Sequence, residues 1–199
     1  MNNYPSTIKN LINCFKKLPG IGERNAERLA LSILNLSDDE VNLFSQSLID
    51  MKKKIRRCSE CNYYSESEHC SICDEKNRNN EIICVVENPK NVALFEKIGS
   101  YNGLYHVLDG LISPLDGINP EDININSLVD RIKKGKIKEV IIAVKPTIEG
   151  ETTSLYISKI LEGMGVKITK IAHGVPLGTD MEYIDSLTLE LAIADRTEI

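Results

Sequence analysis

The first part of the chain shows helical hydrophobic spacing. Apolar positions from Ile8 to Leu18 recur every three or four residues and predict an amphipathic helix. A turn follows at 19–22, and a second helix is expected over 23–35. Ser37 and Glu40 form a capping-box pattern that opens a third helix. Five apolar residues are expected to face inward on this third helix: Val41, Phe44, Leu48, Met51 and Ile55.

From residue 81 onward the pattern changes to alternating strands and helices. Continuous apolar runs predict buried strands at 82–88, 104–108, 139–145 and 166–172. Asn88 followed by Pro89 predicts a helix start, and Gly99 its end. Further helices are expected before Gly135 and over 149–163. The alternation predicts a mainly parallel sheet covered by helices on both faces.

These patterns predict a multidomain α/β protein with four parts. An all-helical domain takes up residues 1–57, and a polar, cysteine-bearing module without periodicity takes up 58–80. The α/β domain is expected over 81–176. The tail, 177–199, contains a loop and an amphipathic helix around 182–194, and we assign this segment to oligomerisation.

Composition narrows the class of protein. The chain has 199 residues, of which 42% are hydrophobic and 27% charged, as in ordinary globular proteins. It has no 18-residue apolar run and no signal-peptide pattern at its start, so we expect neither membrane insertion nor export. The cytoplasm is therefore the expected location.

Charge is unevenly distributed along the chain. The net charge is −5, yet residues 1–57 contain ten basic against six acidic residues. A basic N-terminal part on an acidic body indicates a polyanion contact at that end. Chance scatter of charge explains the same counts equally well.

Four cysteines show metal-ligand spacing. Cys58, Cys61, Cys70 and Cys73 form a C-x2-C-x8-C-x2-C pattern. Two such pairs can direct four thiolates at one ion, which is typical of a structural Zn²⁺ site without an open position. Free thiols, a redox pair or an iron–sulfur cluster are the alternatives.

Three other residues near this chemistry receive ordinary roles. His69 adjoins a ligand position and is expected to support the site or face solvent. Cys14 lies on a helix and Cys84 on a strand, and both are expected to be buried apolar residues.

The turn between the first two helices has the features of a phosphate site. Gly20 and Gly22 leave backbone amides uncovered next to the start of the second helix. Arg24 and Arg28 follow one turn apart on one face of that helix. The stretch LPGIGERNAERLA resembles the helix-hairpin-helix motif of proteins that bind DNA without sequence preference. The alternative is a helical hairpin that only packs. The residues expected to contact DNA are Gly20, Gly22, Arg24, Arg28, Lys16 and Lys17.

The order of these motifs resembles the bacterial RecR recombination-mediator family over essentially the whole chain. The stretches that carry the resemblance are LPGIGERNAERLA, the cysteine quartet, VVENPKNV, GLYHVLDGLISPLDGI, PTIEGETTSLYI and HGVPLGTDMEY. The resemblance implies a Toprim fold for about 81–174 and a ring-like homo-oligomer, a dimer or a tetramer, that can encircle DNA. It also implies partnership with the RecO and RecF proteins in loading recombinase onto gapped or single-stranded DNA, and hence association with the nucleoid.

The Toprim resemblance raises a question about catalysis. Catalytic Toprim domains carry a glutamate after the first strand and a D-x-D motif before an E-G-E-like turn. Glu87 matches the first position, but Lys145 and Thr147 replace the two aspartates. Mg²⁺ prefers several hard oxygen ligands, and a lysine there repels it. We therefore expect no catalytic residues, and assign Glu87, Glu149 and Glu151 to partner binding.

Two rival functions follow from the same residues. A Toprim nuclease or topoisomerase-like enzyme would use the three glutamates with Asp109 or Asp116. A nucleotide-binding regulator would need a phosphate-binding loop of the G-x-x-x-x-G-K-[ST] type, which the sequence lacks.

Overall fold

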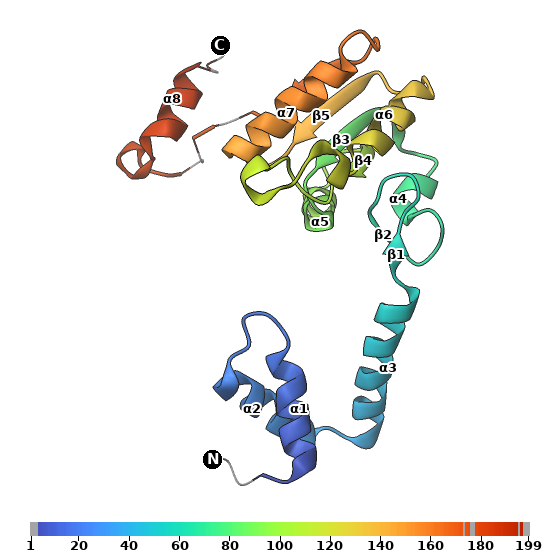
Figure 1. The fold of residues 1–199 in the computed structure, drawn as a ribbon, viewed down its shortest axis with the longest axis vertical. Helices are drawn as coiled ribbons and strands as arrows, with labels where there is room; N and C mark the ends of the chain where they lie inside the picture. Colours follow the sequence, from blue (N-terminus) through green and yellow to red (C-terminus); the bar gives the residue numbers. More distant parts are fainter. Residues whose placement is uncertain (1–3, 173, 176–177, 195, 197–199) are drawn as a thin grey trace. The chain divides into compact units, whose positions relative to one another are not determined.

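The computed structural model describes residues 4–172, 174–175, 178–194 and 196 (Figure 1). The chain divides into two compact units, Met1–Ile55 and Arg56–Ile199. Each unit has its own packing and is described by itself.

The N-terminal unit is helical, as predicted. Its elements are α1 (Ser6–Lys16), α2 (Glu23–Ser32), the 3-10 helix η1 (Ile33–Asn35) and α3 (Asp38–Lys54). Helices α1 and α2 pack through a small cluster in which Ile12, Ala26 and Ala30 are buried. The small side chains on α2 allow the two helices to approach closely, so the turn between them is held firmly at both ends.

Helix α3 starts as predicted but is buried differently. Ser37 and Glu40 form the expected capping box. The prediction that the apolar residues of α3 face inward is wrong, because none of its residues is buried. Phe44, Leu48 and Met51 are 45%, 54% and 63% exposed. Periodicity identifies an apolar face, but it cannot tell whether the same chain covers that face.

The C-terminal unit contains a four-stranded parallel sheet with strand order β4-β3-β5-β6. The strands are β3 (Asn79–Val86), β4 (Gly103–Val107), β5 (Glu139–Ala143) and β6 (Lys167–Lys170). The helices are α5 (Pro89–Ile98), α6 (Ile125–Lys133) and α7 (Ile148–Leu161). The expected helix signals are confirmed: Asn88 caps α5, and Gly99 ends it in the left-handed conformation with φ 72°.

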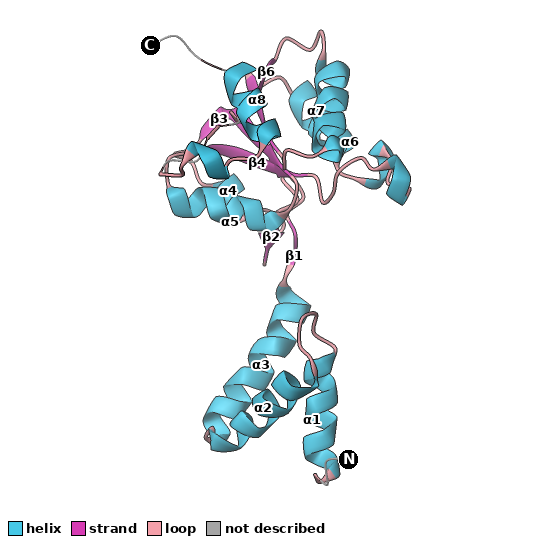
Figure 2. Cartoon of the chain, turned by 90° about the vertical axis from the view of Figure 1, so that its left-hand side faces the viewer, coloured by secondary structure: helices cyan, strands magenta, loops and turns pink. Residues whose placement is uncertain are grey.

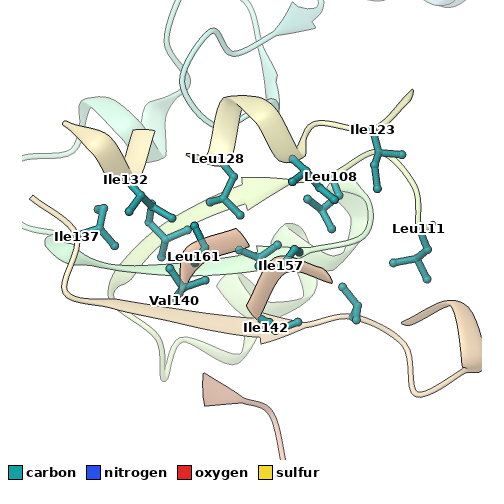
Figure 3. Packing of buried hydrophobic residues seen from close by; sticks show 14 of the residues in the cluster. Leu108, Leu111, Ile123, Leu128, Ile132, Ile137, Val140, Ile142, Ile157 and Leu161 are labelled. Carbon is teal, nitrogen blue, oxygen red and sulfur yellow. The ribbon is translucent and has the colours of Figure 1, made fainter. Parts of the chain in front are cut away.

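Two helices cover one face of the sheet. Leu128 and Ile132 of α6 and Ile157 and Leu161 of α7 pack on strand residues such as Val140 (Figure 3). All of these side chains are almost completely buried. This cluster is the largest apolar core of the unit, and it fixes the position of the loops that join the strands to α6 and α7.

The opposite face is covered by α5 together with the cysteine-bearing segment. That segment, residues 56–75, is here called the cysteine module, and it contains β1 (Arg56–Arg57), β2 (Tyr64–Ser65) and α4 (Ser71–Asp74). Its buried residues Cys61 and Ile72 share one cluster with Val86 and Tyr105 of the sheet. Figure 2 shows α5 on one side of the sheet and α6 and α7 on the other.

The two cysteines outside the quartet differ in burial, and the C-terminal tail contains a 3-10 helix followed by an α-helix. Cys84 is buried on β3 as predicted, but Cys14 is exposed, so that prediction is wrong. Cys14 lies on the solvent side of α1, away from the face that contains Ile12. In the tail, the 3-10 helix η4 (Met181–Tyr183) precedes α8 (Ser186–Ala194).

Candidate functional site

The turn between α1 and α2 exposes backbone amides beside a helix start. Gly20 has φ 79°, a value that favours glycine, and nothing lies within 4 Å of the place where a side chain would begin. Gly22 is the N-cap of α2 and provides no capping side chain. The first backbone amides of α2 are therefore available to bind an anion. Helix N-termini favour anions because these N–H groups and the helix dipole point towards them.

Basic side chains stand on the same helix. Arg24 and Arg28 are exposed and line one shallow depression together with Asn35. Lys17 is exposed, whereas Lys16 forms an ion pair with Glu23 of α2. The structure thus places the predicted DNA-contacting residues in the same small unit, with Lys16 partly neutralised.

The four cysteines converge on one point. Their sulfur atoms all lie within 4.8 Å of one another. The Cys61 and Cys70 sulfurs are 3.4 Å apart, and those of Cys58 and Cys73 are 3.9 Å apart. Four thiolates around a tetrahedral Zn²⁺ stand about 3.8 Å apart, because each lies about 2.3 Å from the ion. The cluster therefore fits a metal that prefers sulfur ligands.

Electrostatics favour a cation inside this cluster. The hydrogen bonds of the Cys61 thiol with Cys70 and Cys73, together with burial, hold the pKa of Cys61 well above its usual range, because each favours the protonated thiol. A divalent ion would reverse that preference and hold all four groups as thiolates. His69 is not among the converging groups, as expected, and lies 3.6 Å from the Asp74 carboxylate instead.

The cysteine module is joined to the sheet by Asn62, which sequence reasoning missed. Asn62 follows the first cysteine pair and has φ 62°, an uncommon value for a residue other than glycine. Its amide donates to the Val107 carbonyl at 3.1 Å and to Asp109 at 2.9 Å. The Val107 amide in turn donates to the Cys61 carbonyl at 2.9 Å. Strand β4 and the first cysteine pair are thus connected directly.

Charged residues reinforce this connection. Arg57 pairs with Asp109 at 2.7 Å, and Glu60 pairs with Lys134 at 3.0 Å and with Arg131 at 3.4 Å. Arg131 is largely buried and also donates to the Tyr105 carbonyl. Asp109, which the enzyme alternative would use as a metal ligand, is therefore occupied in holding the cysteine module.

Glu87 and Lys145 meet at the carboxyl ends of neighbouring strands. Glu87 directly follows β3, and Lys145 follows β5 by two residues. These strands are adjacent although they are not consecutive in sequence. Their side chains form an ion pair of 3.3 Å, in which Glu87 is the less exposed partner. A cation thus lies against the glutamate that a catalytic Toprim domain would use for metal.

The turn after Lys145 is fixed by packing. The Thr147 side chain caps α7 by accepting from the Gly150 amide at 3.3 Å. A Cβ atom added to Gly150 would lie 1.9 Å from the Lys145 carbonyl oxygen, so only glycine fits there. The hydrogen bond with Thr147 holds the pKa of Glu149 below its usual range, and the charge of Lys145 acts in the same direction.

The remaining acids of this region do not converge. Glu151 forms an ion pair with Lys170 of β6, and Asp116 accepts from the Ser113 hydroxyl at 2.7 Å. In the part of the chain that the structure describes, the cysteine quartet is the one group of metal-ligating side chains whose ligand atoms come together. Glu87, Glu149 and Glu151 are here called the acidic edge.

Comparisons with known proteins point to one family over nearly the whole length of the chain. Family models match a RecR helix-hairpin-helix at residues 8–52, a Toprim domain at 81–172 and a RecR C-terminal region at 174–197. The chain is 48% identical over 197 residues to "Recombination protein RecR" of Staphylococcus aureus (strain MRSA252) and of Staphylococcus haemolyticus (strain JCSC1435). Each alignment covers 99% of this chain and 100% of the relative. None of the helices that the structure describes combines the length and the apolar character that a membrane span requires.

Proposed function

Because the chain belongs to the RecR family of recombination proteins, we propose that it is a non-enzymatic, DNA-binding recombination mediator. It acts with the RecO and RecF proteins to load recombinase onto gapped or single-stranded DNA. The place of action is the cytoplasm, at the nucleoid. The observation that carries the non-enzymatic part is the Glu87–Lys145 ion pair.

The ion pair supports a loss of metal chemistry. A Mg²⁺ site needs several oxygen ligands at about 2.1 Å in near-octahedral geometry. Glu87 has a lysine beside it, Glu151 has another, and Asp109 is bound by Arg57. Three of the carboxylates that the enzyme alternative requires are thus directed at protein cations, and Asp116 is bound by the Ser113 hydroxyl, instead of all facing a shared point.

The cysteine quartet is proposed to hold one structural Zn²⁺ per chain. Four sulfur ligands leave no open coordination position, so the ion has no place for a substrate. The burial of Cys58, Cys61 and Cys70 in the cluster beneath the sheet supports a structural role. The metal would keep a module of few apolar residues in contact with β4.

DNA is proposed to bind at the α1–α2 turn. The amides near Gly20 and Gly22 and the side chains of Arg24, Arg28 and Lys17 suit phosphate groups, and Lys16 joins them when its pairing with Glu23 is released. Contacts to phosphate carry no sequence information, so binding is indifferent to sequence and sensitive to salt. The net charge of −5 makes a single copy a weak binder.

A homo-oligomer, a ring-like dimer or tetramer, would overcome that weakness. Several copies of the turn acting together raise the effective affinity without new contacts. Three large apolar side chains on α3 are 45% to 63% exposed. Exposed apolar faces of this kind are typically covered by another protein surface, which supports an oligomer. We also assign residues 177–199 to oligomerisation, a segment of which 177, 195 and 197–199 lie outside the described residues.

A reconstituted assay tests the proposed function. Gapped DNA coated with single-strand-binding protein is incubated with recombinase, RecO and RecF, and the recombinase ATPase reports loading. Adding this chain should stimulate loading, and Arg24→Ala/Arg28→Ala should reduce both stimulation and salt-sensitive DNA binding. Lys90→Ala is the matched control, because it removes an exposed cation from α5 in the other unit.

The enzyme alternative predicts a different result. Supercoiled plasmid incubated with the chain and Mg²⁺ or Mn²⁺ would be nicked or relaxed, and Glu87→Gln would abolish that activity. We expect the plasmid to remain supercoiled in both cases. Sustained relaxation that depends on Glu87 would contradict the non-enzymatic proposal.

A further inference from the structure

Two apolar side chains protrude beside the acidic edge. Leu115 is 98% exposed and Ile148 is 83% exposed, which makes them the two most exposed large apolar residues of the described chain. Leu115 lies in the loop after β4, and Ile148 is the first residue of α7 after β5. Both segments leave the carboxyl end of the same sheet, where open α/β sheets bind their ligands.

The loop that presents Leu115 is held by its own hydrogen bonds. The amide and carbonyl groups of Ser113 and Ile118 pair in both directions, at 3.0 and 2.9 Å. The Ser113 hydroxyl donates to Asp116 at 2.7 Å, and Gly117 closes the turn with φ 72°. Leu115 is thus fixed at the tip of an ordered turn, and a partner would not need to order this loop on binding.

The same loop is tied to α7, which presents Ile148. The Ile112 amide donates to the Thr153 hydroxyl at 2.9 Å, and both residues are buried. The charge of Asp116, beside Leu115, also acts to raise the pKa of Glu149, beside Ile148. The two apolar residues therefore belong to one surface, whose charged members are Asp116, Glu149 and Lys145 with its ion-pair partner Glu87.

We propose that Leu115 and Ile148 are the anchors of a protein-docking surface, and that its partner presents an apolar pocket bordered by lysine and arginine side chains. We infer the basic border of the partner from charge complementarity, because Asp116 and Glu149 flank the anchors directly and Lys145 forms its ion pair with Glu87. The inference rests on the proposed function, and it specifies how the acidic edge meets its partner. The apolar anchors supply affinity, and the acids supply steering.

The test uses purified RecO protein from the same organism and calorimetry at low and moderate salt. Leu115→Ser/Ile148→Ser should weaken RecO binding at least about tenfold, as expected for anchor residues, and leave the salt dependence unchanged. Asp116→Asn/Glu149→Gln should instead reduce the salt dependence. The matched control is Leu94→Ser/Ile98→Ser, which removes two apolar residues that are 56% and 61% exposed on α5. Circular dichroism and metal content verify that each variant is folded.

The outcomes separate the two proposals. Wild-type binding that the anchor variant retains within twofold overturns the docking surface and leaves the proposed function standing. Equal losses in the anchor variant and the α5 control also overturn it, since the effect would then not belong to this surface. If the wild-type chain does not bind RecO, the partner assignment of the proposed function fails and the docking surface fails with it.

Discussion

The cysteine quartet and the acidic edge are both groups of metal-type ligands at the surface of one sheet, but they are arranged in opposite ways. The four sulfurs point at one centre and lie within 4.8 Å of one another. The carboxylates Glu87 and Glu151 each face a lysine of the same chain. Anionic ligands gather at one point only when a cation will occupy it, because their mutual repulsion is otherwise uncompensated. At the acidic edge, protein cations neutralise Glu87 and Glu151 one at a time, so these carboxylates do not share a point where a metal ion could bind.

Among the changes that test this contrast, replacing one cysteine of the quartet should have the largest effect on stability. Cys61→Ser should lose the metal and destabilise the chain by about 4 kcal/mol, because the metal's binding free energy contributes to folding. Elemental analysis and thermal unfolding measure both effects. Cys14→Ser is the matched control, since Cys14 is exposed on α1 and should change neither. A metal-free wild type with unchanged stability after chelation would contradict the structural role.

At the acidic edge, the largest expected effect comes from Gly150. Alanine at a helical position normally stabilises, but here its Cβ would lie 1.9 Å from the Lys145 carbonyl oxygen. Gly150→Ala should therefore destabilise the chain by about 3 kcal/mol in urea unfolding. Gly22→Ala is the control, since no atom lies within 4 Å of its Cβ position. A neutral or stabilising Gly150→Ala would mean that the turn is not fixed by packing.

The stability of the chain should depend on pH through His106, which lies in the sheet beneath both regions. Burial lowers the pKa of His106 to about 4, so the folded chain resists its protonation. Between that pKa and the unfolded value of about 6.5 the unfolded state binds more protons, and stability falls as pH falls. From pH 7 to pH 5 the loss should be about 2 kcal/mol. His106→Gln should lose that much less over the same interval, and equal slopes would exclude His106 as the cause.

The smallest expected effect comes from changing the acidic edge so that its carboxylates share one point, as the sulfurs of the cysteine quartet do. Lys145→Asp/Thr147→Asp removes the cation beside Glu87 and adds two carboxylates, so Mg²⁺ affinity should rise about tenfold. Calorimetry measures the change, and Lys170→Asp is the control, since it frees Glu151 but adds no ligand next to Glu87. Tight Mg²⁺ binding by the unaltered chain would show that the lysine does not disable this site.

Local signals predicted much of this molecule. The cysteine spacing indicated the cluster, the capping box opened α3, and Asn88 and Gly99 bounded α5. Each signal depends on residues a few positions apart, whose geometry the backbone fixes directly. The exposure of α3 and of Cys14 was not predictable in this way. Periodicity identifies which residues share a face, while their burial depends on which other segment lies against it.

Three features can be read directly from the amino-acid sequence: the order of the elements, the donor atoms of the cysteine quartet, and the loss of the D-x-D carboxylates at Lys145 and Thr147. The partners that these residues meet depend on how the chain folds. Lys145 reaches Glu87 because β5 lies beside β3 in the sheet, although β4 comes between them in sequence. Asp109 binds Asn62 across 47 positions, which joins the cysteine module to β4. Such contacts follow from strand order and packing, and no local pattern in the chain encodes them.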